Sequence, residues 1–429
     1  MALGASGRGW AELGVPPDRS HDAVVSERDA EPVITMITMD RETSSAVFAR
    51  SDGKEARFPL ETSPFDDTSA LSRLQYTPAF DTLLAVTGAG DDILFELPKQ
   101  DGTDQLGGRV VVYLDQNKWS DIAKAMHDPT RVNEEDRLAA RQLAEWAHHR
   151  RIILPASSGH YYETTKQFNA EERYGLGLTI LQLSCGWQMR DPLQVRRDEL
   201  YTWFRHGSAT VAQTRDATVF TLDPNVMHGR VRDRGPYVAP ADFSPDAAFQ
   251  HEALTSAMAL IDLMLDSERI KPGPETGWAG ANQRFSDWLD GEDRDSQQKR
   301  KCIDAFLLWD LRTEIAEESH AAGATPEQLQ RWLPIQSAGD IRELHATGLF
   351  GEMLHDRHLN KGTKWRPNDL TDMVYLSCAA GYADFVVCEN HMGSVLAQGL
   401  KRLGRPQRVF RRIRDAVPAI AAALAGTAH

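Results

Sequence analysis

Hydrophobic and polar positions follow two different patterns on either side of residue 109. Between residues 32 and 103 the apolar residues fall in short runs: VITMITMD, SSAVFAR, ARFPL and LLAVTGAGDDILFEL. Ser51-Asp52-Gly53-Lys54 and the GAGDD segment are turn signals between such runs. We therefore predict a small β-rich domain over residues 32–103. Residues 1–31, rich in glycine, proline, serine and charge, are expected to form a flexible leader.

From Arg109 onward, apolar strands alternate with helical segments. VVVYLD and RIILPAS have the composition of buried strands, whereas SDIAKAMHD and EEDRLAARQLAEWAHHR have helical character. Residues 170–365 are mainly helical, and the alternation returns with LTDMVYLSCAAGYA and DFVVCE. Strands separated by helices predict an α/β fold with a parallel sheet and helical layers. We assign it to residues 109–169 and 366–400, with a long α-helical insertion at 170–365 and a basic C-terminal segment and tail at 401–429.

Composition limits the classes of protein that fit. The chain has 429 residues, a formal net charge of −14 and four scattered cysteines without a CxxC pair. It has no run close to the roughly 20 apolar residues that a membrane span needs. A reduced, cytoplasmic location without membrane association is the expectation. The acidic balance argues against a protein that coats nucleic acid indiscriminately, but it is compatible with a metal site built from carboxylates.

Acidic residues occur where the predicted strands end and helices begin. Asp115 follows VVVYL, and Glu163 lies early in the helix after RIILPAS. Asp372 lies in the first turn of a later helix, and Glu389 and Asn390 follow DFVVC. Each acid alone is equally typical of a helix cap or of a partner for the helix dipole. Carboxyl ends of parallel strands share one edge of a sheet, however, and ligands bind there.

The order of these features resembles the PIN-domain nuclease family. YLDQNKWSDIA is similar to its opening strand, a hydrophobic run followed by Asp-x-Asn, with Asp115 and Asn117 at those places. Ser157 and Glu163 have the six-residue spacing of its second motif. DMVYLSCAAGYADFVVCEN is similar to its last part, with Cys388 and Asn390 where the family has Thr-x-Asp. The resemblance covers about a third of the chain, residues 109–168 and 366–400.

This resemblance implies a metal-dependent nuclease, with RNA favoured over DNA as substrate. Its catalytic residues would be Asp115, Glu163 and Asp372, and Asn390 would join them as a ligand of Mg²⁺ or Mn²⁺. Hard cations of this kind prefer oxygen ligands and keep several waters. The resemblance gives supporting roles to Asn117, Ser157, Asp369, Glu389 and Asn390. Asp369 is equally explained as a helix cap, with Asp372 three residues later.

Two departures leave other functions open. The chain has an amide, Asn390, in place of the fourth acid, and the gap between Glu163 and Asp372 is long. A non-catalytic PIN-like module that binds nucleic acid or protein is one alternative. A phosphatase of the haloacid-dehalogenase type is less favoured, because it needs a second aspartate two residues after Asp115, where Asn117 stands.

A dense basic segment follows the last predicted strand. Its candidate phosphate-binding residues are Arg405, Arg408, Arg411 and Arg412. A solvated helix face or a docking site for an acidic partner explains the same pattern, and a homo-oligomer or a regulatory partner is compatible with the sequence.

Overall fold

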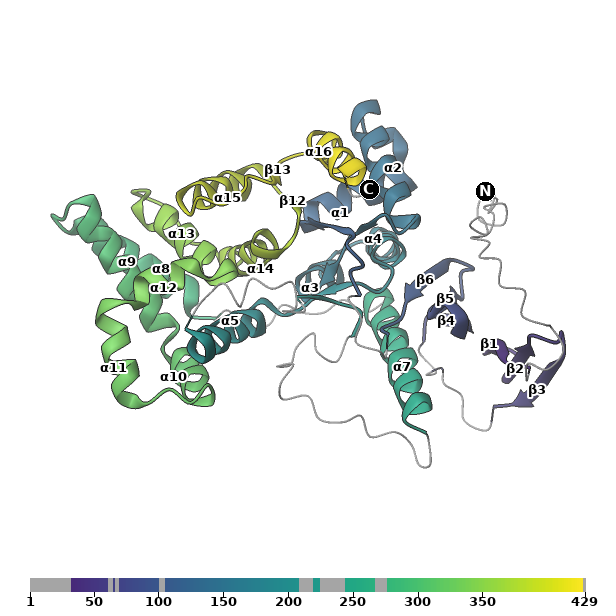
Figure 1. Ribbon diagram of the computed structural model, residues 1–429. Coiled ribbons are helices and arrows are strands. Elements are labelled where there is room, and N and C mark those ends of the chain that lie inside the picture. The colour runs from purple at the N-terminus through teal and green to yellow at the C-terminus, as the bar shows by residue number, and fades with distance from the viewer. Residues whose placement is uncertain are drawn as a thin grey trace.

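The computed structural model describes residues 32–60, 65, 69–99, 105–207, 219–223, 244–266 and 276–426. The expected leader at residues 1–31 lies outside this part of the chain. The fold is mixed α/β and predominantly helical, with a parallel sheet at its centre (Figure 1). Within the described residues, no helix combines the length and hydrophobicity that a membrane crossing requires.

The N-terminal unit is an antiparallel sheet, as predicted for this region. Its strands are β1 (Ile34–Asp40), β2 (Ser45–Arg50), β3 (Glu55–Pro59), β4 (Leu71–Thr77), β5 (Thr82–Thr87) and β6 (Asp92–Glu96). They pair in the order β3-β2-β1-β4-β5-β6. Gly53 makes the β2–β3 turn with a φ of 78°, a conformation that favours glycine. Strand β4 was not predicted, because the charged and polar residues of LSRLQYT obscure its alternation.

A second sheet carries the parallel strands. It contains β7 (Val110–Leu114), β8 (Ile152–Ile153), β12 (Phe385–Val387) and β13 (Val409–Phe410) in the order β13-β12-β7-β8. Two residues after β8 the chain enters β9 (Ala156–Ser157), which pairs in parallel with β10 (Gln188–Met189). The short strand β11 (Phe220–Thr221) adds an antiparallel edge. Strand β7 therefore lies inside the sheet, with a parallel neighbour on each side.

Helices cover both faces of this sheet. The apolar run of β7 is buried throughout, as expected for a strand enclosed on two sides. Its alternate residues belong to different hydrophobic clusters: Val112 and Leu114 to one, Val111 and Tyr113 to the other. The helices nearest the first cluster are α1 (Gln116–His127), α2 (Glu134–His148), α4 (Ala170–Ser184), α7 (Pro245–Leu265) and α16 (Ile413–Gly426). Those of the second include α5 (Pro192–His206), α13 (His345–Leu359), α14 (Asp369–Tyr382) and α15 (Asn390–Arg402).

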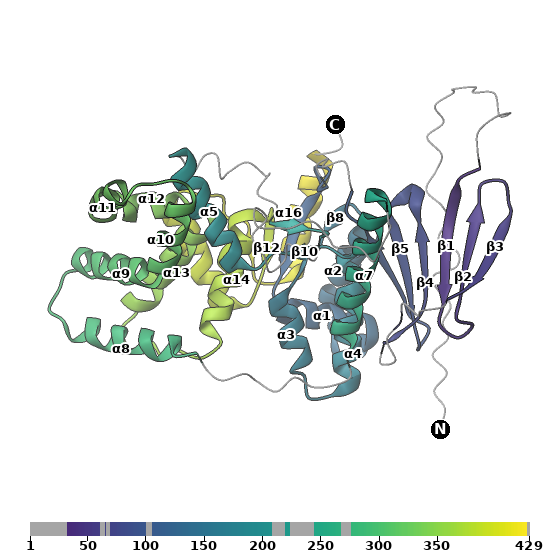
Figure 2. The same cartoon turned by 90° about the horizontal axis from the view of Figure 1, so that it is seen from below.

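The two outer parts of the molecule lie on opposite sides of the parallel sheet (Figure 2). The N-terminal sheet packs beside α4 and α7, where the Asp262 carboxylate accepts hydrogen bonds from the Ser69 hydroxyl and the Ala70 amide, at 2.8 and 2.9 Å. The far side is helical. It contains α8 (Trp278–Gly291), α9 (Ser296–Asp310), α10 (Arg312–Ala321), α11 (Pro326–Ile335) and α12 (Ser337–Glu343), and the short helix α3 (Ser158–Thr165) follows β9 in the centre.

Parallel strand pairing continues further along the chain than the sequence predicted, and β9, β10 and β11 form a sheet of their own. Strand β10 lies within the expected insertion at 170–365, and β13 lies within the expected basic tail at 401–429. Helix α16 then packs on α2. Each of these strands has only two residues, which is too short to produce a readable alternation. The described part of the 170–365 segment is otherwise mainly helical, as predicted.

Candidate active site at the carboxyl edge of the parallel sheet

Asp115 stands at the carboxyl end of β7 and caps helix α1. Its backbone amide donates to the Val387 carbonyl of β12 at 2.9 Å, and its carboxylate accepts from the Gln116 amide at 2.9 Å. The expected helix cap is therefore present. The side chain remains partly exposed, because the chain turns away from the sheet at this residue. Asn117, the second residue of α1, is exposed to solvent.

Glu163 lies on helix α3, and polar contacts hold that helix in place. The fully buried Ser157 hydroxyl caps α3, accepting from the His160 amide at 3.4 Å, and lies 3.3 Å from the Tyr113 hydroxyl of β7. The Gln116 side chain donates to the Thr164 hydroxyl at 3.0 Å, which joins α1 to α3. Ser157 is thus a positioning residue. Glu163, six residues later, is the sixth of the eight residues of α3, so it lies near the end of that helix and not early in it as expected.

A contact between hydroxyl groups connects α3 to α14. The Ser158 and Tyr375 hydroxyl oxygens are 2.5 Å apart. The Tyr375 ring also lies against Gly159, where an added Cβ would approach a ring carbon to 3.3 Å. Helix α14, which carries Asp372 in its first turn, is therefore held beside the helix that carries Glu163.

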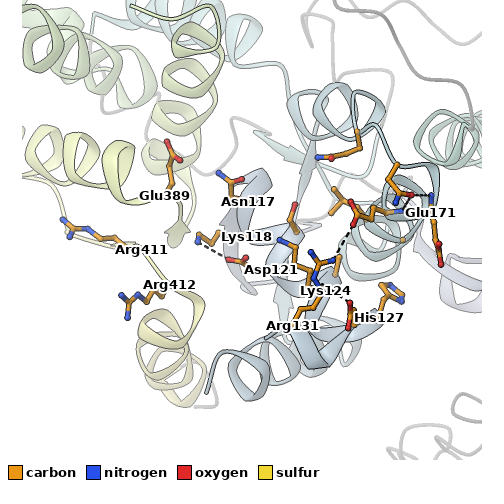
Figure 3. Close-up of a pocket in the computed structure, with 18 of the residues that line it drawn as sticks. Asn117, Lys118, Asp121, Lys124, His127, Arg131, Glu171, Glu389, Arg411 and Arg412 are labelled. Carbon is orange, nitrogen blue, oxygen red and sulfur yellow. Dashed lines mark hydrogen bonds and ion pairs between the residues drawn. The ribbon is translucent and has the colours of Figure 1, made fainter. Parts of the chain in front are cut away.

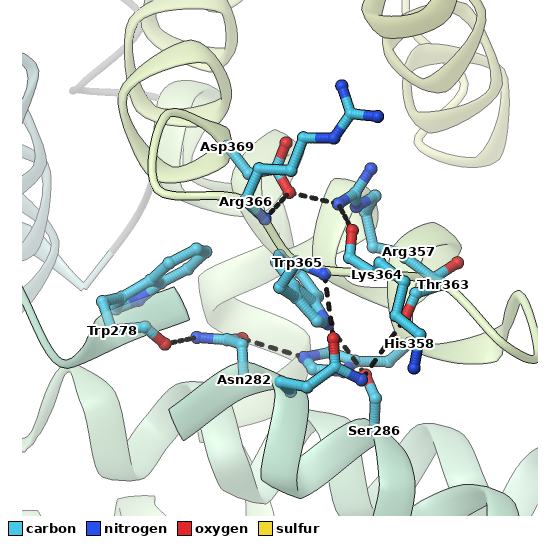
Figure 4. Close-up of polar contacts among 11 residues, drawn as sticks. Trp278, Asn282, Ser286, Arg357, His358, Thr363, Lys364, Trp365, Arg366 and Asp369 are labelled. Atoms are coloured by element: carbon cyan, nitrogen blue, oxygen red, sulfur yellow. Dashed lines mark hydrogen bonds and ion pairs between the residues drawn. The ribbon is translucent and has the colours of Figure 1, made fainter. Parts of the chain in front are cut away.

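Asp369 and Asp372 have different surroundings despite their spacing. Asp369 is 6% exposed. Its carboxylate accepts from the guanidinium of Arg357 and, at 2.7 Å, from the Arg366 amide (Figure 4). Asp372 is partly exposed one turn later. The structure thus gives Asp369 an ion pair that fixes the start of α14. It is not the helix cap that the sequence allowed, because Asn368 is the N-cap residue and Asp369 is the first residue of the helix.

A buried polar network extends from this ion pair into the insertion. The Trp365 indole donates to the Ser286 hydroxyl at 2.9 Å, and that hydroxyl lies 2.8 Å from Nδ1 of His358 (Figure 4). Nε2 of His358 is 3.1 Å from the Asn282 side-chain oxygen. Burial lowers the pKa of His358 to about 3, so the ring is neutral. These groups satisfy one another and connect α8 and α13 to the segment that leads into α14.

The other end of α14 is also anchored by the insertion. The buried carboxylate of Glu199 on α5 accepts from the Tyr382 hydroxyl at 2.7 Å and from the Ala346 amide at 2.6 Å. Gly381 allows α14 to approach α13, because an added Cβ would lie 2.9 Å from the backbone of His345. The insertion therefore positions α14, and with it Asp372.

Glu389 and Asn390 follow β12 and begin α15. Glu389 is the N-cap residue and is half-buried, whereas Asn390 is the first helical residue and is exposed. Cys388, between the strand and Glu389, is fully buried. The acid of this pair therefore lies nearer to the sheet edge than the amide.

Three carboxyl groups from separate segments, those of Asp115, Glu163 and Asp372, have raised pKa values. Burial, together with repulsion from Asp115 and Glu389, raises the pKa of Glu163 to about 7. Burial and repulsion from Asp115, Glu163 and Glu389 likewise raise the pKa of Asp372 to about 7. The pKa of Asp115 is raised by burial and by Glu389, although Lys118 opposes the shift. The structure therefore brings the three predicted catalytic acids into one electrostatic cluster, with Glu389 as the fourth charge.

This carboxylate cluster is not a preassembled coordination shell. Among the residues that the structure describes, no group of three or more His, Cys, Asp or Glu side chains is arranged to hold a metal ion. The donors are all oxygens, which suits Mg²⁺ or Mn²⁺. Burial is the main cause of the raised pKa values of Asp115, Glu163 and Asp372, and repulsion between neighbouring acids adds to it; a bound cation would stabilise the charged carboxylates. The residue chemistry thus fits a hard divalent cation, and side-chain rotation would be needed to gather the oxygens around it.

His160 lies behind the cluster and has an aromatic environment. Its ring stacks on Tyr113, with centroids 5.2 Å apart, and meets the edge of Trp119 at 6.1 Å. Burial lowers the pKa of His160 to about 3, so it is a neutral core residue.

A cavity of about 930 Å³ lies along the exposed side of α1 and reaches Asn117, Glu389 and Asn390 (Figure 3). Arg411 and Arg412 line it on the side opposite α1, from the segment between β13 and α16. The start of α4 forms another wall, with Asn169, Glu171 and Glu172. The cavity thus begins beside the carboxylate cluster and continues to the far end of α1, where His127 and Arg131 line it.

The four predicted phosphate-binding arginines divide into two groups. Arg405 donates to the carbonyl oxygens of residues 342–345, between α12 and α13, at 2.7–3.2 Å. Arg408 lies 3.5 Å from the Asp384 carboxylate. Arg408, Arg411 and Arg412 are all exposed, but of these only Arg411 and Arg412 line the cavity, and Arg411 also donates to the Ser394 hydroxyl at 2.7 Å. Arg405 therefore has a structural role, which the density of charge in the sequence did not reveal.

Sequence reasoning also missed the cations on α1 and just beyond it. Lys118, Lys124 and Arg131 line the cavity. Their spacing gave no clear signal, because six residues turn a helix by about 240° and Arg131 lies beyond the end of α1.

Comparison of the chain with protein-family models, curated proteins and solved structures found no match. The function must therefore be argued from the site itself.

Proposed function

We propose that this protein is a metal-dependent nuclease that hydrolyses phosphodiester bonds, with RNA favoured over DNA. The observation that supports it is that Asp115, Glu163, Asp372 and Glu389 come together from separate segments at one edge of a parallel sheet, where burial and neighbouring acids raise the pKa values of the first three. Grouped acids with pKa values displaced toward neutrality are typical of functional sites. The PIN-like resemblance of the segments that carry these acids adds to the argument.

Asp115, Glu163 and Asp372 would hold Mg²⁺ or Mn²⁺, with Glu389 as the fourth carboxylate in preference to Asn390. When bound, the cation would polarise a phosphoryl oxygen and make a water molecule more acidic. Glu163 and Asp372 titrate near neutral pH, so protons compete with a cation for their oxygens. Asn117 and Asn390, which line the cavity, would orient substrate or water through their amide groups.

A non-catalytic module that binds nucleic acid is the second candidate. The observation that favours it is the lack of a preassembled metal-binding group among the described residues. The cavity and its cations would serve such a module equally well.

Metal-dependent cleavage distinguishes the two candidates. The full chain would be incubated with labelled RNA and DNA oligonucleotides in EDTA, Mg²⁺ or Mn²⁺. The wild type should cut only with metal, and Asp115→Asn should cut at least about a hundredfold more slowly. Asp293→Asn, which removes an exposed acid between α8 and α9, should cut at the wild-type rate. Binding without cleavage under every condition would support the non-catalytic module.

The fourth ligand position can be tested in the same assay. Glu389→Gln should reduce the rate more than Asn390→Ala, because only the first change removes a charge from the carboxylate cluster. A larger effect of Asn390→Ala would instead support Asn390 as the fourth metal ligand, as the sequence predicted.

A further inference from the structure

Two neighbouring cavities share one row of charged residues. The larger, of about 930 Å³, lies along α1, and a second, of about 320 Å³, lies between α1, the start of α2 and the start of α16. The residues common to both linings are Lys118, Asp121, Lys124, Arg131 and Arg412. We call the four cations Lys118, Lys124, Arg131 and Arg412 the cation strip, and Asp121 lies among them.

The members of the cation strip differ in their local partners. Lys118 pairs with Asp121 at 3.2 Å. Arg131 lies 3.6 Å from Glu172 and 3.9 Å from Asp128, and its side chain is 59% exposed. Lys124 and Arg412 are exposed, and within the described ranges neither side chain has a hydrogen-bond or ion-pair partner. Two unpaired cations that line the same two cavities in a chain of net charge −14 indicate an anionic ligand.

We propose that the cation strip binds the phosphodiester backbone of a nucleic-acid strand and leads it along α1 to the carboxylate cluster. This inference rests on the proposed nuclease function. The strip starts at Lys118, less than one turn after Asp115, and continues beyond the end of α1 at Arg131. A helix of 12 residues is about 18 Å long.

The length of the cation strip favours a polymeric anion over a small anion as its ligand. A single phosphate contacts cations within a few ångströms, whereas these cations extend along the whole of α1 and across to α16 (Figure 3). Lysine offers a mobile point charge and arginine a planar fork, and both suit phosphate oxygens in a flexible strand. We therefore assign phosphate contacts to Lys118, Lys124 and Arg131. Of the arginines predicted from the sequence, Arg412 remains a phosphate-binding residue, whereas Arg405 and Arg408 do not.

The test is equilibrium binding without catalysis. The full chain would be titrated against a fluorescent oligonucleotide in EDTA, as RNA and as DNA, between about 50 and 200 mM salt. Lys124→Gln with Arg412→Gln removes the two unpaired cations of the strip. Lys301→Gln with Arg331→Gln is the matched control, since it removes two exposed cations from α9 and α11, in the helical part of the molecule away from α1 (Figure 2).

The strip variant should bind roughly tenfold more weakly at the lowest salt. The slope of log affinity against log salt should fall by about 1.4–1.8, since each phosphate contact contributes about 0.7 with a single strand and 0.9 with a duplex. The control variant should match the wild type. An unchanged slope in the strip variant, or an equal loss in the control, would overturn the proposal. Because EDTA removes metal, loss of this binding is distinguishable from failure of cleavage.

Discussion

Asp369 and Asp372 lie one turn apart on α14, and replacing each with asparagine should change stability in opposite directions. Asp372 has a pKa of about 7 in the folded chain, against 3.8 for an unperturbed aspartate. The folded protein therefore binds more protons than the unfolded chain between these pH values. Stability from this group is fully present below about pH 3.8 and is lost as the pH rises through about 7.

The size of this effect follows from the pKa difference. A change from 3.8 to about 7 corresponds to at most about 4 kcal/mol at pH 8. Water reaches the carboxyl group, and the neighbouring acids share the repulsion. We therefore expect removal of this charge to relieve only about 1–2 kcal/mol of unfavourable folding free energy. Loss of a negative charge in the first turn of α14 costs about 0.5 kcal/mol. Asp372→Asn should therefore stabilise the metal-free protein by about 1 kcal/mol at pH 8.

Asp369→Asn should instead destabilise the protein by about 3–5 kcal/mol, because it leaves the buried Arg357 guanidinium without its anion. Thermal unfolding of both full-length variants at pH 5 and pH 8 would measure the difference. For Asp372→Asn, the rise in melting temperature at pH 8 should be about 2 °C and should shrink toward pH 5. Added Mg²⁺ should stabilise the wild type more than Asp372→Asn.

Two results would refute this reasoning. If Asp372→Asn lowers stability at pH 8 as much as Asp369→Asn does, then Asp372 is a structural cap and the carboxyl groups do not repel. If Mg²⁺ stabilises the wild type and Asp372→Asn equally, then Asp372 does not contribute to a cation site.

Two further predictions concern pH and the basic segment. The affinity for Mg²⁺, measured by calorimetry, should rise between about pH 6 and pH 8, because Glu163 and Asp372 lose their protons near pH 7; a flat profile would contradict the ligand assignment. Arg405→Ala should lower the unfolding free energy by about 2–3 kcal/mol, because its hydrogen bonds to backbone carbonyls are lost. Oligonucleotide affinity of this variant should match that of the wild type, and a selective loss of binding would return Arg405 to the phosphate-binding set.

Local pattern was sufficient for part of the fold. The short apolar runs and turn signals in residues 32–103 predicted a β-rich domain, and the unbroken apolar run 110–114 predicted a buried strand. These features are readable because strand composition and burial act on neighbouring residues. The strands β10 and β13 were not readable, because two residues are too few to show a pattern.

The sequence alone determined which segments would place acids at the ends of strands, and it named Asp115, Glu163 and Asp372. Only the tertiary structure decided what each charge does. It paired Asp369 with Arg357, directed Arg405 to backbone carbonyls, and left Lys124 and Arg412 along the cavity. The reason is physical: a charged group's ionisation and its partner depend on burial and on side chains brought from distant parts of the chain, and neither is encoded in local spacing.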